Sequence, residues 1–247
     1  MSKAEAKTQL IKNFNSNNLK QKLYKFRPLA DDNDFDRLKG ILETGEFWCA
    51  KFSEFNDPRE GGFTTIKAEN IEEIYGEKES YRICSFSAKR AFSNPLMWSY
   101  YANGFKGVAL EIKARDSEVK KITYAENIPD LEAMSNGQKT IIILTTKLRP
   151  WKHECEYRFL KKTSDGKNMF KIGEITAIYF GDPYDGAYNK DQIYERSEIL
   201  KRYKEAKSRM VDYVKANQKL KHLRLYSVKI AGCSVVKAED LKKKGVE

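Results

Sequence analysis

The residues best suited to chemistry in this 247-residue chain are Glu154, Glu156 and Arg158. If 151–160 is read as one strand, alternate side chains point to opposite faces, so these three share a face. Two carboxylates two residues apart repel each other unless a positive charge is held beside them. The pattern is typical of a site that handles a developing positive charge. The simpler interpretation is a half-exposed strand in which Glu156 and Arg158 pair side by side.

Three further side chains could join such a site. Arg27 ends the first expected strand, and Ser85 and Ser87 end a later one. A planar guanidinium matches the geometry of phosphate oxygens, and a serine hydroxyl can hold a carboxylate. Two simpler alternatives are that Arg27 pairs with Glu60 or Asp57, and that the serines are small residues on a crowded strand.

Several standard chemistries are excluded by motif. The sequence has no Gly-x-Gly-x-x-Gly and no Gly-Lys-Ser/Thr phosphate loop, and it has no Gly-x-Ser-x-Gly nucleophile turn. Its only histidines are His153 and His222, and its four cysteines are scattered without a Cys-x-x-Cys pair. We therefore expect no metal site, and reduced thiols in a cytoplasmic protein.

Composition and charge limit the fold and the partners. A hydrophobic content of 40% is enough for one large domain or two small ones. The sequence has no run of 18 apolar residues, so we expect no membrane span. The formal charge of +11 lies at the ends, because 201–247 carries +9 and 1–22 carries +4. Such segments can bind nucleic acid, although a lysine-rich helix is more often a solvated face.

The hydrophobic pattern predicts an α+β fold. We expect 1–22 to be a basic extension and 23–247 a single domain with a mostly antiparallel split sheet, flanking helices and a basic helical part at 182–247. Predicted strands are 23–27, 47–52, 81–87, 107–113, 119–124, 154–158, 174–181 and 223–230. Predicted helices lie between 31 and 45, at 68–75, from a Ser93 cap to Gly104, at 138–148 and, as one long helix, at 189–218.

An arginine on the first strand, a Ser-x-Ser strand and a Glu-x-Glu strand follow one another in this order. The order resembles the Arg–Ser–Glu pattern of the ADP-ribosyltransferase fold seen in cholera-like toxins. The helical stretch from Leu38 to Gly45 adds to the likeness.

A second resemblance covers roughly 23–181. The chain is similar to an uncharacterised bacterial domain-of-unknown-function family whose members share six short motifs. The matches are Tyr24, Lys25, Arg27; Asn56, Asp57, Pro58, Glu60; Ser85, Phe86, Ser87; Met97, Trp98, Ser99, Tyr101, Ala102; Lys106, Gly107; and Trp151, Glu154, Glu156, Arg158. The family often has histidine where this chain has Tyr100 and Phe105.

The ADP-ribosyltransferase resemblance implies roles for these residues. Glu156 would stabilise the ribosyl cation formed when nicotinamide leaves NAD, and Glu154 would accept a proton from the attacking group. Arg27 would bind the pyrophosphate. Residues that would complete the NAD site are Tyr24, Ser85, Ser87, Trp98 and Tyr101, although the helix that carries Trp98 is more often core.

The leading hypothesis is therefore an ADP-ribosyltransferase-like enzyme that uses NAD as substrate, without a metal, in bacterial defence. One alternative is a non-catalytic nucleic-acid or protein-binding module on the same fold, acting in phage defence. Another is an enzyme acting on a nucleotide or RNA end. We expect Glu156→Gln to stop NAD turnover with little effect on stability, because a partly exposed strand carboxylate contributes about 0–1 kcal/mol.

Overall fold

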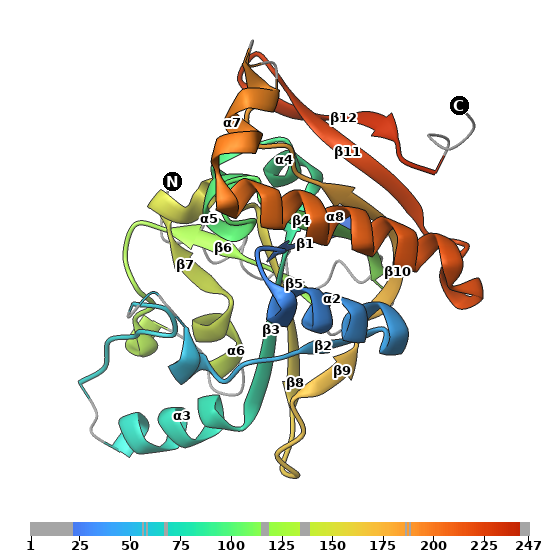
Figure 1. Ribbon diagram of the computed structural model, residues 1–247. Helices are drawn as coiled ribbons and strands as arrows, with labels where there is room; N and C mark the ends of the chain where they lie inside the picture. Colours follow the sequence, from blue (N-terminus) through green and yellow to red (C-terminus); the bar gives the residue numbers. More distant parts are fainter. Residues whose placement is uncertain are drawn as a thin grey trace. The chain divides into compact units, whose positions relative to one another are not determined.

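The computed structural model describes residues 22–55, 57, 59–66, 69–114, 119–133, 139–185, 187 and 189–242. The chain is a mixed α+β protein whose strand pairs are mostly antiparallel (Figure 1). It divides into two compact units. The described residues of unit 1 lie within 47–86 and 119–170, and those of unit 2 lie within 22–46, 87–114 and 171–242. The expected basic extension lies, apart from Lys22, outside the described residues.

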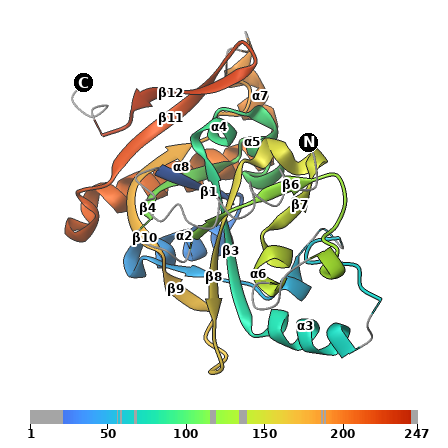
Figure 2. The same ribbon diagram turned by 180° about the vertical axis from the view of Figure 1, so that it is seen from behind.

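Unit 2 is built on a sheet with the strand order β12-β11-β10-β4-β1. Neighbouring strands are antiparallel except β10 and β11, and β11 and β12 form a long hairpin (Figure 2). A Cβ atom on Gly107 would lie 2.3 Å from the Arg27 carbonyl oxygen, so only glycine fits where β4 begins beside β1. The strand bounds are β1 Lys22–Pro28, β4 Gly107–Ala114, β10 Gly173–Phe180, β11 Arg224–Ala231 and β12 Ser234–Asp240.

Several helices of unit 2 contact its strand β1. α2 (Asp32–Thr44) starts at the side chain of Asp31 and ends at Gly45, which is left-handed, as its sequence predicts. α2 and α8 (Glu198–Ala216) lie side by side (Figure 1). The remaining helices are α4 Lys89–Phe92, α5 Pro95–Tyr101 and α7 Lys190–Arg196.

Two helix boundaries in unit 2 differ from prediction. The expected long helix is broken at Ser197, whose side chain accepts a hydrogen bond from the Leu200 amide and starts α8 as a separate helix. The cap of α5 is Asn94 and not Ser93, because the Asn94 side chain accepts from the Leu96 amide at 3.0 Å.

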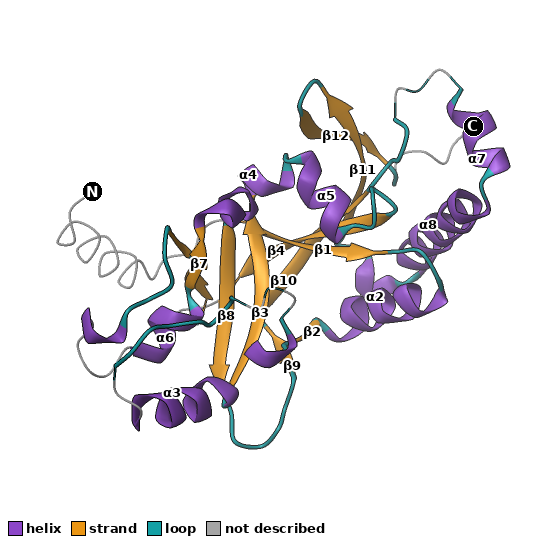
Figure 3. Ribbon diagram, turned by 90° about the vertical axis from the view of Figure 1, so that its left-hand side faces the viewer, coloured by secondary structure: helices purple, strands orange, loops and turns teal. Residues whose placement is uncertain are grey.

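Unit 1 holds the strands β3, β8 and β5, with β3 and β8 adjacent (Figure 3). Residues 81–86 of β3 belong to this unit, and 87–88 belong to unit 2. The two-stranded sheets β2–β9 and β6–β7 accompany them. The bounds are β2 Glu46–Trp48, β3 Tyr81–Ala88, β5 Val119–Lys121, β6 Thr123–Ala125, β7 Thr146–Leu148, β8 Glu156–Lys162, β9 Met169–Lys171, α3 Glu69–Glu79 and α6 Lys139–Leu144.

The segment around Glu154 is not a continuous strand, and that prediction was wrong. Arg149–Glu154 forms a 3-10 helix, Cys155 is left-handed with φ of 43°, and β8 starts only at Glu156. The expected helix at 138–148 is also shorter, since α6 ends at Leu144 and β7 follows. The left-handed Cys155 separates the two glutamates, so Glu154 ends the 3-10 helix and Glu156 begins β8.

Candidate functional site

Five charged side chains of unit 1 converge on one buried cluster, which we call the Glu156 cluster: Glu60, Lys147, Glu154, Glu156 and Arg158. Lys147, on β7, is its central cation. Its Nζ lies 2.6 Å from Glu60 Oε1, 2.7 Å from Glu154 Oε2 and 3.5 Å from Glu156 Oε2. Glu60 comes from the turn after Asp57, so residues nearly a hundred positions apart in sequence meet here.

Arg158 is the second cation and uses its whole guanidinium. Its Nε donates to Glu156 Oε1 at 2.7 Å, Nη2 donates to Glu60 Oε2 at 2.8 Å, and Nη1 donates to the Leu144 carbonyl at 2.8 Å. Arg158 is 1% exposed and Glu156 is 4% exposed. The pairing of Glu156 with Arg158 confirms the simpler sequence interpretation, but the pair is buried and not half-exposed.

The protonation of the cluster follows from its partners. Burial alone would raise the pKa of Glu156, but the charges of Arg158 and Lys147 and hydrogen bonds from Arg158 and Ser85 lower it to about 2. Burial works against the charged form of Lys147 as well, yet the three carboxylates hold its pKa above the ordinary value. Glu156 is therefore ionised at neutral pH.

Ser85 and Tyr124 fix the position of Glu156. The Ser85 side chain hydrogen-bonds to the Glu156 carboxylate and helps to lower its pKa. The Glu156 amide donates to the Tyr124 hydroxyl at 2.8 Å. These contacts hold both ends of the residue, so the carboxylate is placed in advance of any ligand.

The charges in the cluster define what it can do. Counted as ionised, three carboxylates and two cations leave one negative charge in a buried place. A permanently ionised glutamate is a poor general acid, but it can stabilise a neighbouring positive charge. No group of His, Cys, Asp and Glu in the described part of the chain could hold a metal ion.

The other predicted site residues belong to unit 2. Arg27 lies on β1, and its Nε is buried with no hydrogen-bond partner among the described residues. Ser87 is buried at the end of β3. Trp98 is fully buried and packs edge-on against Phe26, with ring centroids 5.4 Å apart, and it is therefore a core residue. That Arg27, Ser87 and Glu156 share one cleft stays a prediction.

Tyr24 and Tyr101 have different surroundings. The Tyr24 hydroxyl donates to Glu111 Oε2 at 3.3 Å, and burial, followed by the charge of Glu111, raises the pKa of Tyr24. Tyr101 ends α5 and is 37% exposed. Tyr24 is thus engaged within unit 2, whereas Tyr101 presents part of its ring to solvent.

A second buried carboxylate, Glu111 on β4, was missed in the sequence. It is 1% exposed and accepts hydrogen bonds from two tyrosines, a threonine and two cations. The distances are 3.3 Å for Tyr24, 3.1 Å for Tyr179, 2.7 Å for Thr176, 2.8 Å for Arg224 and 3.0 Å for Lys22. No motif marks Glu111, and only the unusual charge inside the apolar run of β4 could have indicated it.

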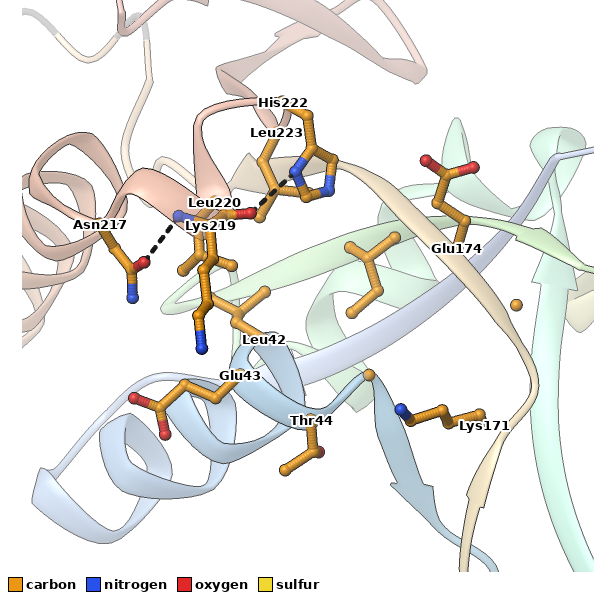
Figure 4. Close-up of a pocket in the computed structure, with 13 residues that line it drawn as sticks. Leu42, Glu43, Thr44, Lys171, Glu174, Asn217, Lys219, Leu220, His222 and Leu223 are labelled. Atoms are coloured by element: carbon orange, nitrogen blue, oxygen red, sulfur yellow. Dashed lines mark hydrogen bonds between the residues drawn. The ribbon is translucent and has the colours of Figure 1, made fainter.

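Unit 2 also has a surface cavity of about 500 Å³ (Figure 4). Buried leucines form part of its wall, and Glu43, Lys171, Glu174, Lys219 and His222 line its rim. His222 Nδ1 lies 3.1 Å from the Lys219 carbonyl. Two carboxylates and two lysines line the cavity, so its charge favours no class of ligand.

In the described part of the chain, no helix is both long enough and apolar enough to cross a membrane.

Comparison with known proteins found no relative of this chain. No protein-family model, no curated protein and no solved structure matches the sequence or the fold.

Proposed function

We propose that this chain is an ADP-ribosyltransferase-like enzyme that cleaves NAD and transfers ADP-ribose, with Glu156 as its catalytic residue. The observation that carries the proposal is the hydrogen bond from Ser85 to the Glu156 carboxylate. It joins the Ser-x-Ser strand to the Glu-x-Glu segment, and holding the glutamate is one of the two roles that the resemblance allows for these serines. The simpler alternative, in which the serines are only small residues on a crowded strand, does not require this hydrogen bond.

The chemistry asks for a fixed negative charge. When the bond from ribose C1′ to the nicotinamide nitrogen breaks, its electron pair stays on nicotinamide and a cation develops on the ribose. An ionised Glu156 lowers the energy of that cation. The acceptor then bonds to C1′ and loses a proton, for which Glu154 is the proposed base.

Access to Glu156 requires a change of partners. Both of its oxygens are engaged by Arg158 and Lys147, and the side chain is almost fully covered. Lys147 is the partner that can yield, because its contact with Glu156 is 3.5 Å long while its contacts with Glu60 and Glu154 are shorter. A ribose hydroxyl would take the place that Lys147 leaves.

The remaining roles are proposals that the unit 2 residues support separately. Because the Nε of Arg27 has no hydrogen-bond partner in the described part of the chain, it could donate to an anion such as a pyrophosphate. Nucleic-acid binding through 201–247 is favoured less. Two cations of α8 are already paired, Lys201 with Glu198 at 2.9 Å and Arg209 with Asp32 at 2.7 Å.

The test is Ser85→Ala, which removes the hydroxyl that carries the proposal. We expect nicotinamide release from NAD to fall roughly tenfold, about the contribution of one hydrogen bond to a charged group. Ser208→Ala, on the exposed side of α8, is the matched control and should release nicotinamide at the wild-type rate. Equal rates for Ser85→Ala and wild type would remove the supporting observation. A wild type that releases no nicotinamide with any acceptor would favour the binding module.

A further inference from the structure

Lys78 is a buried lysine that the proposed chemistry does not use. It lies near the end of α3 in unit 1 and is 4% exposed. Its ammonium is 3.9 Å from the centre of the Phe52 ring, 5.4 Å from that of Phe63 and 5.5 Å from that of Tyr75. Three aromatic rings therefore surround the charge, an arrangement that stabilises a desolvated cation.

The caged ammonium donates a hydrogen bond to the loop that carries Glu60 of the Glu156 cluster. Lys78 Nζ donates to the carbonyl oxygen of Gly61 at 2.6 Å. Gly61 directly follows Glu60, which bridges Lys147 and Arg158. A buried ammonium is costly unless it is hydrogen-bonded, so this contact ties the loop firmly to α3.

The loop itself is shaped to accept the contact. The Asp57 side chain accepts from the Arg59 amide at 2.9 Å, and the Asp57 carbonyl accepts from the Glu60 amide at 3.0 Å. Gly61 has φ of +69°, and a Cβ there would lie 3.3 Å from Lys78 Cε. A close-fitting turn and a caged ammonium together fix where Glu60 stands.

We propose that Lys78 is a positioning residue: by holding the Gly61 carbonyl, it sets Glu60, and through Glu60 it sets the two cations that face Glu156. The inference that this placement matters for turnover rests on the proposed function. The inference that Lys78 holds the loop does not.

Charged and titratable neighbours of Lys78 are Glu79 and the Tyr75 ring, and Glu79 pairs with Lys51 at 3.4 Å. Burial lowers the pKa of Lys78, and Glu79 opposes this only in part. The ammonium is therefore lost at a lower pH than for an ordinary lysine, which weakens the contact with Gly61 on the alkaline side. An arginine at this position would keep its charge there.

The experiment compares Lys78→Met with Lys78→Arg. The control is Lys162→Met, because Lys162 is an exposed lysine of β8 that pairs with Glu77 of α3, the helix that carries Lys78. Hydrogen exchange is followed at the amides of Glu60 and Gly62, both of which are hydrogen-bonded within the turn. Lys78→Met should speed exchange at these amides about tenfold or more, without lowering the melting temperature, because methionine removes the buried charge. Lys78→Arg should restore slow exchange.

Nicotinamide release is the second measurement on the same proteins. For Lys78→Met we expect kcat to fall about tenfold with KM for NAD unchanged, since a small misplacement of a supporting group affects the reaction more than binding. Unchanged exchange at Glu60 and Gly62 in Lys78→Met would overturn the positioning role, whatever the activity. Faster exchange in a protein whose wild type releases no nicotinamide would support the positioning role and contradict the proposed function.

Discussion

Glu156 in unit 1 and Glu111 in unit 2 are both buried carboxylates that face cations, yet their surroundings differ. Glu111 accepts hydrogen bonds from three hydroxyl groups and from two cations. These cations are about half exposed, Lys22 at 52% and Arg224 at 48%. Glu156 shares two buried cations with two other carboxylates. One carboxylate saturated by five donors is an anchor for strands. The Glu156 cluster has one more carboxylate than cations, so it can stabilise an additional positive charge. We therefore assign the chemistry to this cluster.

The largest effect expected from this contrast is on the stability of unit 1. Arg158→Met should destabilise the fold by about 3–5 kcal/mol, because it leaves Glu156 and Glu60 as buried charges with too few partners. Lys162→Met, on the same strand, removes only an exposed pair and should cost about 0–1 kcal/mol. Denaturant unfolding of both variants measures the difference. Similar midpoints for the two would mean that the cluster is solvated.

The ionised carboxylate of Glu156 should also make the stability of the fold depend on pH. The folded-state pKa of Glu156 is about 2, below the usual 4.5, so the stabilisation is present above pH 4.5 and is lost as the pH falls toward 2. It should amount to on the order of 3 kcal/mol. Unfolding free energies between pH 6 and 2.5 should fall less steeply in Glu156→Gln than in wild type. The expectation of little effect on stability assumed a partly exposed carboxylate, whereas Glu156 is buried.

The smallest of the three effects belongs to Glu111. Glu111→Gln keeps the size of the side chain but offers an amide group to donors that need an acceptor. We expect a loss of about 1–3 kcal/mol, in the range for a buried group with an unsatisfied partner. Nicotinamide release per folded molecule should stay at the wild-type level. A selective loss of release with unchanged stability would place the chemistry at Glu111 and reverse the comparison.

Local patterns explain why part of this was predictable. The alternation in 23–27 and the caps Asp31 and Gly45 predicted β1 and α2, because these signals act over a few residues. The Glu156–Arg158 pair was also predictable, as both residues stand two apart on one strand.

Partners that lie far apart in the sequence could not be predicted from such local patterns. Lys147 lies in 138–148, which was predicted as a helix although its isoleucines favour a strand, and nothing local connects Lys147 with Glu60. The left-handed Cys155 breaks the expected alternation, yet Glu154 still reaches Lys147 because the 3-10 helix before it turns the chain. Glu111 needed its tyrosine partners from two other strands, and these appear only once the sheet is assembled.

The central claim is that the charge of Glu156 drives the cleavage of NAD. Its most direct test is the rate of nicotinamide release by purified wild type and Glu156→Gln, with Glu111→Gln as the matched control and the folded fraction of each measured by its melting curve. We predict a loss on the order of 10²–10³ for Glu156→Gln, about 3–4 kcal/mol, and no loss for Glu111→Gln. A wild type that releases nicotinamide at the same rate as Glu156→Gln would contradict the claim.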